Sequence, residues 1–514
     1  MRIKSAIKNS FFGILGQVVL IVVGFFCQRT MNLLMGAELV GMNGVISNVI
    51  AILSVSELGI ATAVIYNLYA AIAAQEREQI VGLMHMYRKA YSIFALVIFG
   101  LGLTVMPFIH LTLNEVTFPL SYIRLVFFLW LVRTALSYLL SYKRSILIAD
   151  QKEYLVSIVT LVVNVLNYTS TIIILKLFRN YVLALGINII VEIVSNLWIA
   201  AYVNRKYPFL IQRRKAPLER SIVDKVIDNI KNIFVMRLFT KLLLSTDNII
   251  ASGMINTRIA GLYANYCLVT QSLLNVMLAL AGALKPSLGH MFLEEDREKD
   301  VRVLRQITFL FFLIVSVVSV CLLCLITPFV KDLWLSEEYL MEMGVVAAIV
   351  IQFFVTAMGL PLEIVVGVTG LFHKERNIAI ATTIVNLVVS LFLVRSLGVV
   401  GIVAGTIAAY LVQIGCRMTV FFREYVKQSA FPYLADMAQY AVVTAAEMAL
   451  IYPLITRIYG GGFFGFLLVA MTTAILALGF DLLLYCRSRK LKSVFEMAKQ
   501  VVYGSVPDKE LRRR

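Results

Sequence analysis

The feature that most constrains this chain is a series of about fourteen apolar runs joined by short polar connections. A helix needs roughly 20 apolar residues to cross the hydrocarbon core of a bilayer. Fourteen such helices use nearly all of the 514 residues and leave no room for a large soluble domain. Composition agrees, because the chain is 60% apolar and 15% charged, whereas soluble domains are about 45–50% apolar and about 25% charged. We therefore expect an all-α polytopic membrane protein.

The runs form two groups of six and a final pair. The first six are at about 11–35, 40–69, 90–109, 121–142, 154–175 and 182–203. After the longest polar stretch come 232–253, 259–288, 306–328, 342–368, 378–395 and 399–421, and then 437–457 and 463–486. We predict an N-lobe (1–230), a C-lobe (231–425) and a last part (426–514) that contains two helices and a basic tail.

The distribution of basic residues predicts the orientation. Of the 47 Lys and Arg, 34 lie at the N-terminus, in the tail and in alternate loops, while 6 lie on the opposite side and 7 within helices. Positive charge marks the cytoplasmic side of a membrane protein. We expect both termini in the cytoplasm, in a multi-pass protein of the cell membrane. The net charge of +17 then reflects the membrane face and not binding to nucleic acid.

The two groups of six also resemble each other. Shifted by 220 residues, Val40 and Gly41 align with Ala260 and Gly261, and the triplet 76–78 (ERE) aligns with 296–298 (DRE). Because six spans are an even number, both groups would have the same topology. This pattern predicts two six-helix bundles related by a parallel repeat, with a cavity between two lobes.

Cations inside apolar runs are costly and are candidates for a functional site. Arg133 lies halfway along its run, too far from either end to reach the membrane surface. Arg237 and Lys241 lie four residues apart, hence on one helical face, where like charges repel unless an anion binds there. Arg29, nearer the outer surface, and Lys285, at a helix end, are the other candidate substrate-binding residues.

Acidic and neutral oxygen-bearing residues are the candidates for ion coupling. Salt bridges to the arginines and a proton or sodium role remain open for the membrane acids, which are Glu57, Glu192, Asp247, Glu363, Glu447 and Asp481. Asp247 is joined on other helices by Asn386, Ser390 and Thr406, whose oxygens suit a hard cation. We expect no other cofactor, since the chain has no phosphate-binding loop or histidine cluster. The sequence shows no paired carboxylates and no Ser/His arrangement at one membrane face, which are the patterns that would indicate an enzyme, so we do not expect one.

Residues 9–73 (NSFFGILGQVV…) and 245–269 (STDNIIASGMINTRIAGLYANYCLV) resemble the polysaccharide-repeat flippases. These belong to the multidrug/oligosaccharidyl-lipid/polysaccharide exporter superfamily, and the resemblance covers roughly 1–425. It implies two six-helix bundles around a V-shaped cavity, two appended helices, and outward movement of undecaprenyl-diphosphate-linked sugars by alternating access. Polysaccharide polymerase and glycosyltransferases are the implied protein partners, beside the lipid-linked oligosaccharide and membrane lipids.

The resemblance also implies roles for individual residues. In related lipid II flippases, helix 1 arginines bind the diphosphate, and Arg29 is the nearest match. The sodium site of those relatives falls on Asp247, Asn386, Ser390, Ile402 and Thr406, with a sodium ion expected at Asp247, Asn386 and Thr406. Ser390 stands where they have an acid, and Glu57 where they have a basic residue.

A lipid diphosphate is anionic, so its carrier needs cations in a wet cavity, which Arg133, Lys241 and Arg29 supply. The alternative is a cation-coupled multidrug or metabolite antiporter, which favours acids and aromatic residues. A membrane-embedded glycosyltransferase ranks last, because the outer loops are short and hold only scattered acids. We therefore expect a flippase for capsule, exopolysaccharide or related polysaccharide synthesis, with sodium or a proton as coupling ion.

Overall fold

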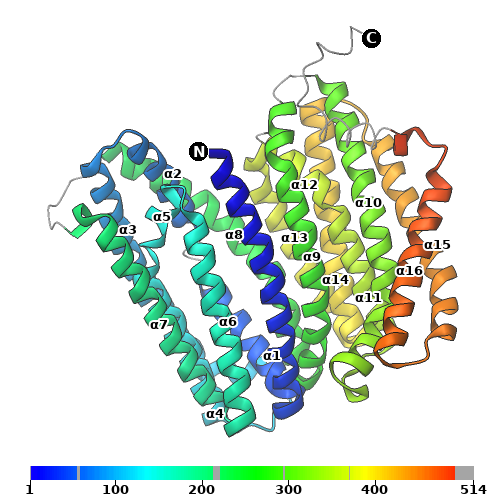
Figure 1. The fold of residues 1–514 in the computed structure, drawn as a ribbon, viewed down its shortest axis with the longest axis horizontal. Coiled ribbons are helices and arrows are strands. Elements are labelled where there is room, and N and C mark those ends of the chain that lie inside the picture. The colour runs from blue at the N-terminus through cyan, green and yellow to red at the C-terminus, as the bar shows by residue number, and fades with distance from the viewer. Residues whose placement is uncertain (1, 55–57, 212–219, 293–295, 370, 493–514) are drawn as a thin grey trace. The chain divides into compact units, whose positions relative to one another are not determined.

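The computed structural model describes residues 2–54, 58–211, 220–292, 296–369 and 371–492, and within them all regular structure is helical (Figure 1). The α-helices are α1 (Arg2–Leu53), α2 (Leu58–Ala73), α3 (Arg77–Val105), α4 (Leu120–Ser141), α5 (Arg144–Ala149), α6 (Glu153–Phe178), α7 (Tyr181–Lys206), α8 (Arg220–Met254), α9 (Thr257–Met291), α10 (Arg297–Pro328), α11 (Met343–Met358), α12 (Leu360–Val368), α13 (Glu375–Leu397), α14 (Val399–Met418), α15 (Phe431–Ile458) and α16 (Gly462–Tyr485). Short 3-10 or π-helical turns are η2 (Met106–Thr112), η3 (Pro208–Ile211), η5 (Phe329–Trp334), η6 (Glu337–Tyr339), η7 (Leu371–Lys374) and η8 (Thr419–Val426).

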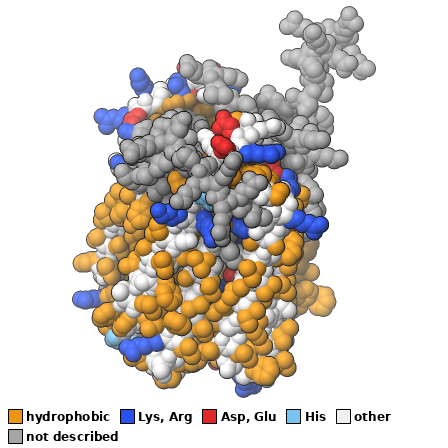
Figure 2. Space-filling model, turned by 90° about the vertical axis from the view of Figure 1, so that its left-hand side faces the viewer, with side chains coloured by type: hydrophobic (Ala, Val, Ile, Leu, Met, Phe, Trp, Pro, Cys, Tyr) orange, Lys and Arg blue, Asp and Glu red, His pale blue; other side chains and the backbone are white. Residues whose placement is uncertain are grey.

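The helices carry the surface of a membrane protein. Within the described residues, twelve helical segments are long and apolar enough to span a bilayer. Large apolar side chains point outward from them, for example Leu96 (72% exposed), Leu177 (69%) and Phe392 (80%). Figure 2 shows one face whose lower part is covered mostly by hydrophobic side chains. An apolar surface of this extent is stable only in lipid. The prediction of an all-α polytopic membrane protein is confirmed.

The twelve segments and the fourteen predicted runs differ for identifiable reasons. The segment Gly16–Leu53 counts as one, although it contains most of the first predicted run and the start of the second. The two parts meet at Gly36, whose φ of 82° and ψ of 163° are non-helical and accessible to glycine because it lacks a Cβ atom. Helix α8 is not among the twelve, and its residues 234–254 contain three charged residues, Arg237, Lys241 and Asp247.

Two predicted runs are each built from two helices. The run predicted at 40–69 is divided between α1, which ends at Leu53, and α2, which begins at Leu58. The run predicted at 342–368 is divided at Gly359 between α11 and α12, and Pro361 stands in the first turn of α12. Proline has no N–H to donate and therefore favours a helix start at this point. Hydropathy does not detect such breaks, because the residues on both sides are apolar.

The chain divides by its internal contacts into two units. Unit 1 comprises Met1–Cys267 and Asn386–Ile402, and unit 2 comprises Leu268–Val385 and Val403–Arg514. In unit 1, α1 packs on α6 and α8, and α4 packs between α3 and α7. In unit 2, α10 is central and packs on α11, α15 and α16. The predicted lobe boundaries at 230 and 425 are a division by topology and stay a prediction.

Candidate functional site

Arg133 lies near the middle of α4 and has a counter-ion on α7. Its Nη2 atom is 4.0 Å from Oε2 of Glu192, and its guanidinium carbon is 5.3 Å from the centroid of the Trp130 ring. Only 22% of the Arg133 side chain is exposed. A partly buried cation is stabilised by a carboxylate and by the electron-rich face of an indole ring. Arg133 therefore has a carboxylate and an indole ring as neighbours in the described structure.

Glu192 also faces a second arginine, Arg144, which lies at the start of α5. The Arg144 Nη2 atom is 3.9 Å from Oε1 of Glu192 and donates a 2.7 Å hydrogen bond to Oδ1 of Asn196. Asn196 in turn donates to Glu192 over 3.4 Å. Two guanidinium groups therefore share one carboxylate, and the formal charge of the three side chains together is +1. Arg144 was not among the predicted site residues, because it stands between two apolar runs and resembles an ordinary loop cation.

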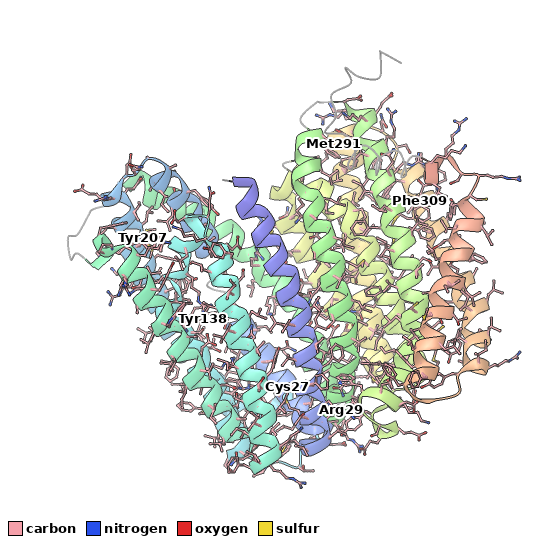
Figure 3. All side chains as sticks on the ribbon, viewed as in Figure 1. Cys27, Arg29, Tyr138, Tyr207, Met291 and Phe309 are labelled. Atoms are coloured by element: carbon pink, nitrogen blue, oxygen red, sulfur yellow. The ribbon has the colours of Figure 1, made fainter. Side chains whose placement is uncertain are left out.

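A cavity of about 330 Å³ lies beside this cluster, within unit 1. Most of its polar lining consists of hydroxyl groups and the two ionic residues, which are Tyr87, Tyr91, Ser137, Tyr138, Ser141, Arg144, Ser145 and Glu192. Tyr87 donates a 2.8 Å hydrogen bond to Tyr91, and the Tyr91 and Tyr138 rings meet edge to face at 5.9 Å. Figure 3 labels Tyr138 among the helices of this unit. Hydroxyl groups and a guanidinium group can donate hydrogen bonds to the oxygen atoms of phosphates and sugars. We call this space the unit 1 cavity.

The other predicted cations are placed separately. Arg29 on α1, also labelled in Figure 3, and Lys241 on α8 are half-buried, whereas Arg237 on α8 and Lys285 on α9 are exposed. Within the described residues, none of these four forms an ion pair. Arg237 and Lys241 lie one turn apart on α8, as the sequence predicts. Unlike Arg133, these side chains carry charge that no carboxylate in the described structure offsets.

Several oxygen-bearing residues of the predicted ion site are buried. Asn386 and Ser390 on α13 are fully buried, and Asp247 on α8 is half-buried. The Thr246 hydroxyl donates to Oδ1 of Asn386 over 3.1 Å, and the Ser390 hydroxyl donates to the Ile402 carbonyl over 3.2 Å.

Helix α8 therefore meets α13 through Thr246, the residue before Asp247, and α13 meets the start of α14 through Ser390 and Ile402 of the predicted set. Thr406, which is 3% exposed, lies one turn beyond Ile402 on α14 and belongs to unit 2. Glu57 lies outside the described residues.

The other membrane acids fall into two kinds. Glu192 and Glu363 face arginines, and Glu363 accepts from Nη1 of Arg417 over 3.1 Å. Arg417, which is 5% exposed, also forms two parallel hydrogen bonds of 2.9 and 3.0 Å to Glu375. Glu447 and Asp481 are fully buried, and among the described residues neither is in an ion pair with a Lys, Arg or His.

The chain was compared with protein families, curated proteins and solved structures, and only the solved structures match it. No protein-family model and no curated protein sequence matches the chain. Among solved structures, the lipid II flippase MurJ, in an inward closed conformation, matches with a TM-score of 0.68, 13% identity and coverage of 92% of this chain and 99% of that one. An inward-facing multidrug resistance MATE family transporter of the MOP superfamily matches with a TM-score of 0.62, 14% identity and coverage of 79% and 95%.

This chain shares the fold of these two solved structures. A MOP superfamily transporter from Pyrococcus furiosus, reported with a binding pocket of reverse polarity, matches with a TM-score of 0.56, 16% identity and coverage of 83% and 97%. The match to the MATE transporter leaves about a fifth of this chain without a counterpart, since it covers 79% of the residues. The MOP fold was expected from the sequence.

Proposed function

We propose that this protein is a flippase that moves undecaprenyl-diphosphate-linked oligosaccharide repeat units from the inner to the outer leaflet of the cell membrane by alternating access. The observation that carries the proposal is the cluster of Arg133 and Arg144 around the single carboxylate of Glu192, beside a hydroxyl-lined cavity. Its excess positive charge suits an anionic headgroup, and its hydroxyls suit a sugar.

The charge of the cluster favours a diphosphate over a neutral or cationic substrate. An arginine engages two phosphate oxygens at once, and charge-assisted hydrogen bonds are roughly twice as strong as neutral ones. When an anion binds, it replaces Glu192 as the partner of one arginine. The arginine that is released from Glu192 is then free to follow the headgroup, so that the filled and empty sites favour different arrangements.

Fold and surface support a lipid-linked substrate. The chain shares its fold with the lipid II flippase MurJ over 92% of its length. A polyprenyl tail is apolar and remains in the bilayer while the headgroup crosses, so its carrier needs polar groups inside and an apolar exterior. The apolar exterior is seen in the exposed leucines and phenylalanines of the described helices.

A flipping assay with paired substitutions tests the proposal. The purified protein is placed in liposomes that contain a fluorescent undecaprenyl-diphosphate-linked sugar, and a membrane-impermeant quencher measures how much lipid changes leaflet. We expect Arg133→Ala and Arg144→Ala to abolish flipping and Glu192→Gln, which leaves both cations, to keep it. The matched control is Arg395→Ala, because Arg395 is exposed near the end of α13. Normal flipping by both arginine variants would contradict the proposal.

The second candidate is a cation-coupled multidrug or metabolite antiporter. It is favoured by the likeness to a multidrug resistance MATE transporter and by the buried carboxylates. This candidate reverses the signs of the same substitutions, because a cationic compound needs Glu192 and is repelled by the arginines. Efflux of a lipophilic cation that is lost in Glu192→Gln and retained in Arg133→Ala would establish it.

The proposal includes the orientation and the partners. Both termini lie in the cytoplasm, on the side where 34 of the 47 basic residues are expected. The substrate is supplied by glycosyltransferases on that side and consumed by a polymerase on the other. Protease digestion of a C-terminal epitope tag tests the orientation: only inside-out vesicles are expected to lose the tag.

A further inference from the structure

Two carboxyl groups lie side by side inside unit 2, where α15 and α16 pack against α10 (Figure 1). Glu447 of α15 and Asp481 of α16 are both 0% exposed, and so is Ser316 of α10, whose hydroxyl donates to Oε2 of Glu447. The two carboxyl groups are close enough for either one, when protonated, to donate to the other. We name Glu447, Asp481 and Ser316 the acid pair site.

No cation compensates this pair in the described structure. Three other acids of the described helices each contact a Lys or Arg, and these are Glu192, Glu363 and Asp436. Glu447 and Asp481 interact electrostatically with each other instead, and Oε1 of Glu447 and both carboxyl oxygens of Asp481 have no hydrogen-bond partner in the described structure. Two carboxylates in adjacent buried positions cannot both remain charged at low cost, because each is desolvated and repels the other. The arrangement is stable when the pair holds a proton.

Unpartnered hydroxyl groups surround the acid pair site. The side-chain oxygens of Ser319, Thr444 and Tyr485 have no hydrogen-bond partner, and these residues are 0%, 2% and 3% exposed. Ser319 lies one turn from Ser316, Thr444 one turn from Glu447, and Tyr485 one turn from Asp481. Buried polar atoms are nearly always hydrogen-bonded. Three orphaned hydroxyls beside two acids therefore indicate a site whose hydrogen bonds change with its occupancy.

A route to water lies at one end of these helices. A cavity of about 540 Å³ is lined by Phe309, Asp436 and Tyr440 together with Arg305 and Lys490. The Tyr440 ring stacks on Phe312 at 4.4 Å and meets Tyr485 edge to face at 6.4 Å. Phe309, labelled in Figure 3, meets the same Tyr485 ring at 5.1 Å. Tyr485 belongs to this aromatic layer, and Asp481 lies one helical turn before it on α16.

The ionisable groups on the elements around the acid pair site are accounted for. On α10 they are Arg297, Glu298, Lys299, Asp300, Arg302, Arg305, Cys321 and Cys324; on α15, Tyr433, Asp436, Tyr440, Tyr452 and Arg457; on α16, Tyr485, with Lys490 after it; on α12, Glu363; and on η5, Lys331 and Asp332. Asp436 is occupied by Arg305 and Lys490, both at 2.7 Å, and Glu363 by Arg417. Lys331 pairs with Glu337, and Asp332 accepts from Tyr459.

We propose that Glu447 and Asp481 form a proton-binding site, which exchanges one proton with the cavity at Arg305 and Asp436 through the aromatic layer. The ligand is a proton and not a metal ion, because no group of three or more His, Cys, Asp or Glu side chains that could hold a metal occurs among the described residues. Loss of the proton leaves two negative charges in a dry interface. The contact of α15 and α16 with α10 must then loosen or admit water, so proton exchange moves this helix pair.

Infrared difference spectroscopy of the purified full-length protein tests the proposal independently of any substrate. A pH step gives a carbonyl band from each carboxyl group that gains or loses a proton. We expect such a band in the unaltered protein, its loss in both Glu447→Gln and Asp481→Asn, and its retention in the control Glu338→Gln, which changes an exposed acid. A band that persists in both variants would overturn the proposal. A band that sodium removes at constant pH would also overturn it, because the site would then hold a metal ion.

Folding and transport are followed in the same samples. The Gln and Asn side chains keep the shape and the hydrogen bonds of neutral acids, and gel filtration establishes that the variants fold. Should either variant fail to fold, Ser316→Ala replaces it, with a shifted titration of the band expected and an unchanged one contradicting the proposal. In liposomes, a pH gradient should alter flipping by the unaltered protein but not by Glu447→Gln. An absence of flipping in all samples would count against the proposed function alone, since the infrared band reports the proton site.

Discussion

Gly41 and Gly261 pack directly against each other. A Cβ atom on Gly41 would lie 2.0 Å from the carbonyl oxygen of Thr257, and one on Gly261 would lie 1.8 Å from the carbonyl oxygen of Ala37. The contacts are reciprocal, since residues 37 and 41 are separated from residues 257 and 261 by the same shift of 220. A rotation that relates the two segments would produce this reciprocity. Neither position has room for any side chain.

Substitution at this contact is expected to destabilise the protein. Gly41→Ala and Gly261→Ala should each lower the free energy of unfolding by about 1–3 kcal/mol or more, the usual cost of overpacking. Thermal unfolding in detergent is the measurement. The control is Gly44→Ala, where a Cβ atom meets nothing within 4 Å and alanine raises helix propensity by about 1 kcal/mol. Equal melting temperatures for all three variants would show that the helices separate easily at this point.

The ion pairs of Arg417 provide a second prediction. Its guanidinium is buried and reaches Glu375 through two hydrogen bonds and Glu363 through a third. Removing one partner of a buried pair leaves the other charge uncompensated, which costs about 3–5 kcal/mol. Arg417→Gln should therefore lower the thermal stability strongly, and Arg417→Lys should also lower it, because lysine lacks the planar fork. The exposed Arg395→Gln is the control. A neutral effect of Arg417→Gln would mean that Glu375 and Glu363 are well solvated.

A third prediction concerns pH and lies outside the spanning segments. Burial alone would raise the pKa of Asp150, but hydrogen bonds from Lys152 and Tyr207 outweigh it and hold that pKa below its usual value. A carboxyl group with a lowered pKa stabilises the folded state above its unfolded pKa of about 3.9. The contribution is lost as the pH falls through the lower, folded-state pKa.

Melting temperatures of the unaltered protein and Asp150→Asn, measured from pH 7 downward, test this sign. The variant should be less stable at pH 7, and the difference should shrink as the medium becomes acidic. The exposed acid change Glu338→Gln should leave the profile unaltered. A difference that grows toward low pH would contradict the assignment of Asp150 as a stabilising carboxylate.

The sequence predicted the fold well and the partners of the charged residues poorly. Run length and hydropathy suffice to find spanning helices, because the bilayer sets both. The neighbours of Arg133 depend on how α4 and α7 rotate about their axes, which the almost uniformly apolar helix faces do not reveal. The depth of Arg133 in its run singled it out as a candidate site residue, but it did not indicate that Glu192 and Trp130 are its neighbours.

Other features had no signal in one sequence. Arg144 resembles a loop cation and Arg417 a helix-end cation until the structure shows what each contacts. Glu447 and Asp481 were recognised as membrane acids, but two acids that contact each other contradict the usual expectation of opposite charges. The break between α11 and α12 had a visible cause in Pro361, which hydropathy alone does not weigh.

The central claim is that arginines of this membrane protein recognise a lipid diphosphate. The most direct measurement is the affinity of the purified protein for an undecaprenyl-diphosphate-linked sugar and for the same sugar lipid with a single phosphate. A charge-assisted hydrogen bond contributes about 1.5–3 kcal/mol, so we predict a preference for the diphosphate of roughly tenfold or more. The preference should disappear in the Arg133→Ala, Arg144→Ala double variant. Equal affinity for the two lipids, or a preference that survives in the double variant, would contradict the account.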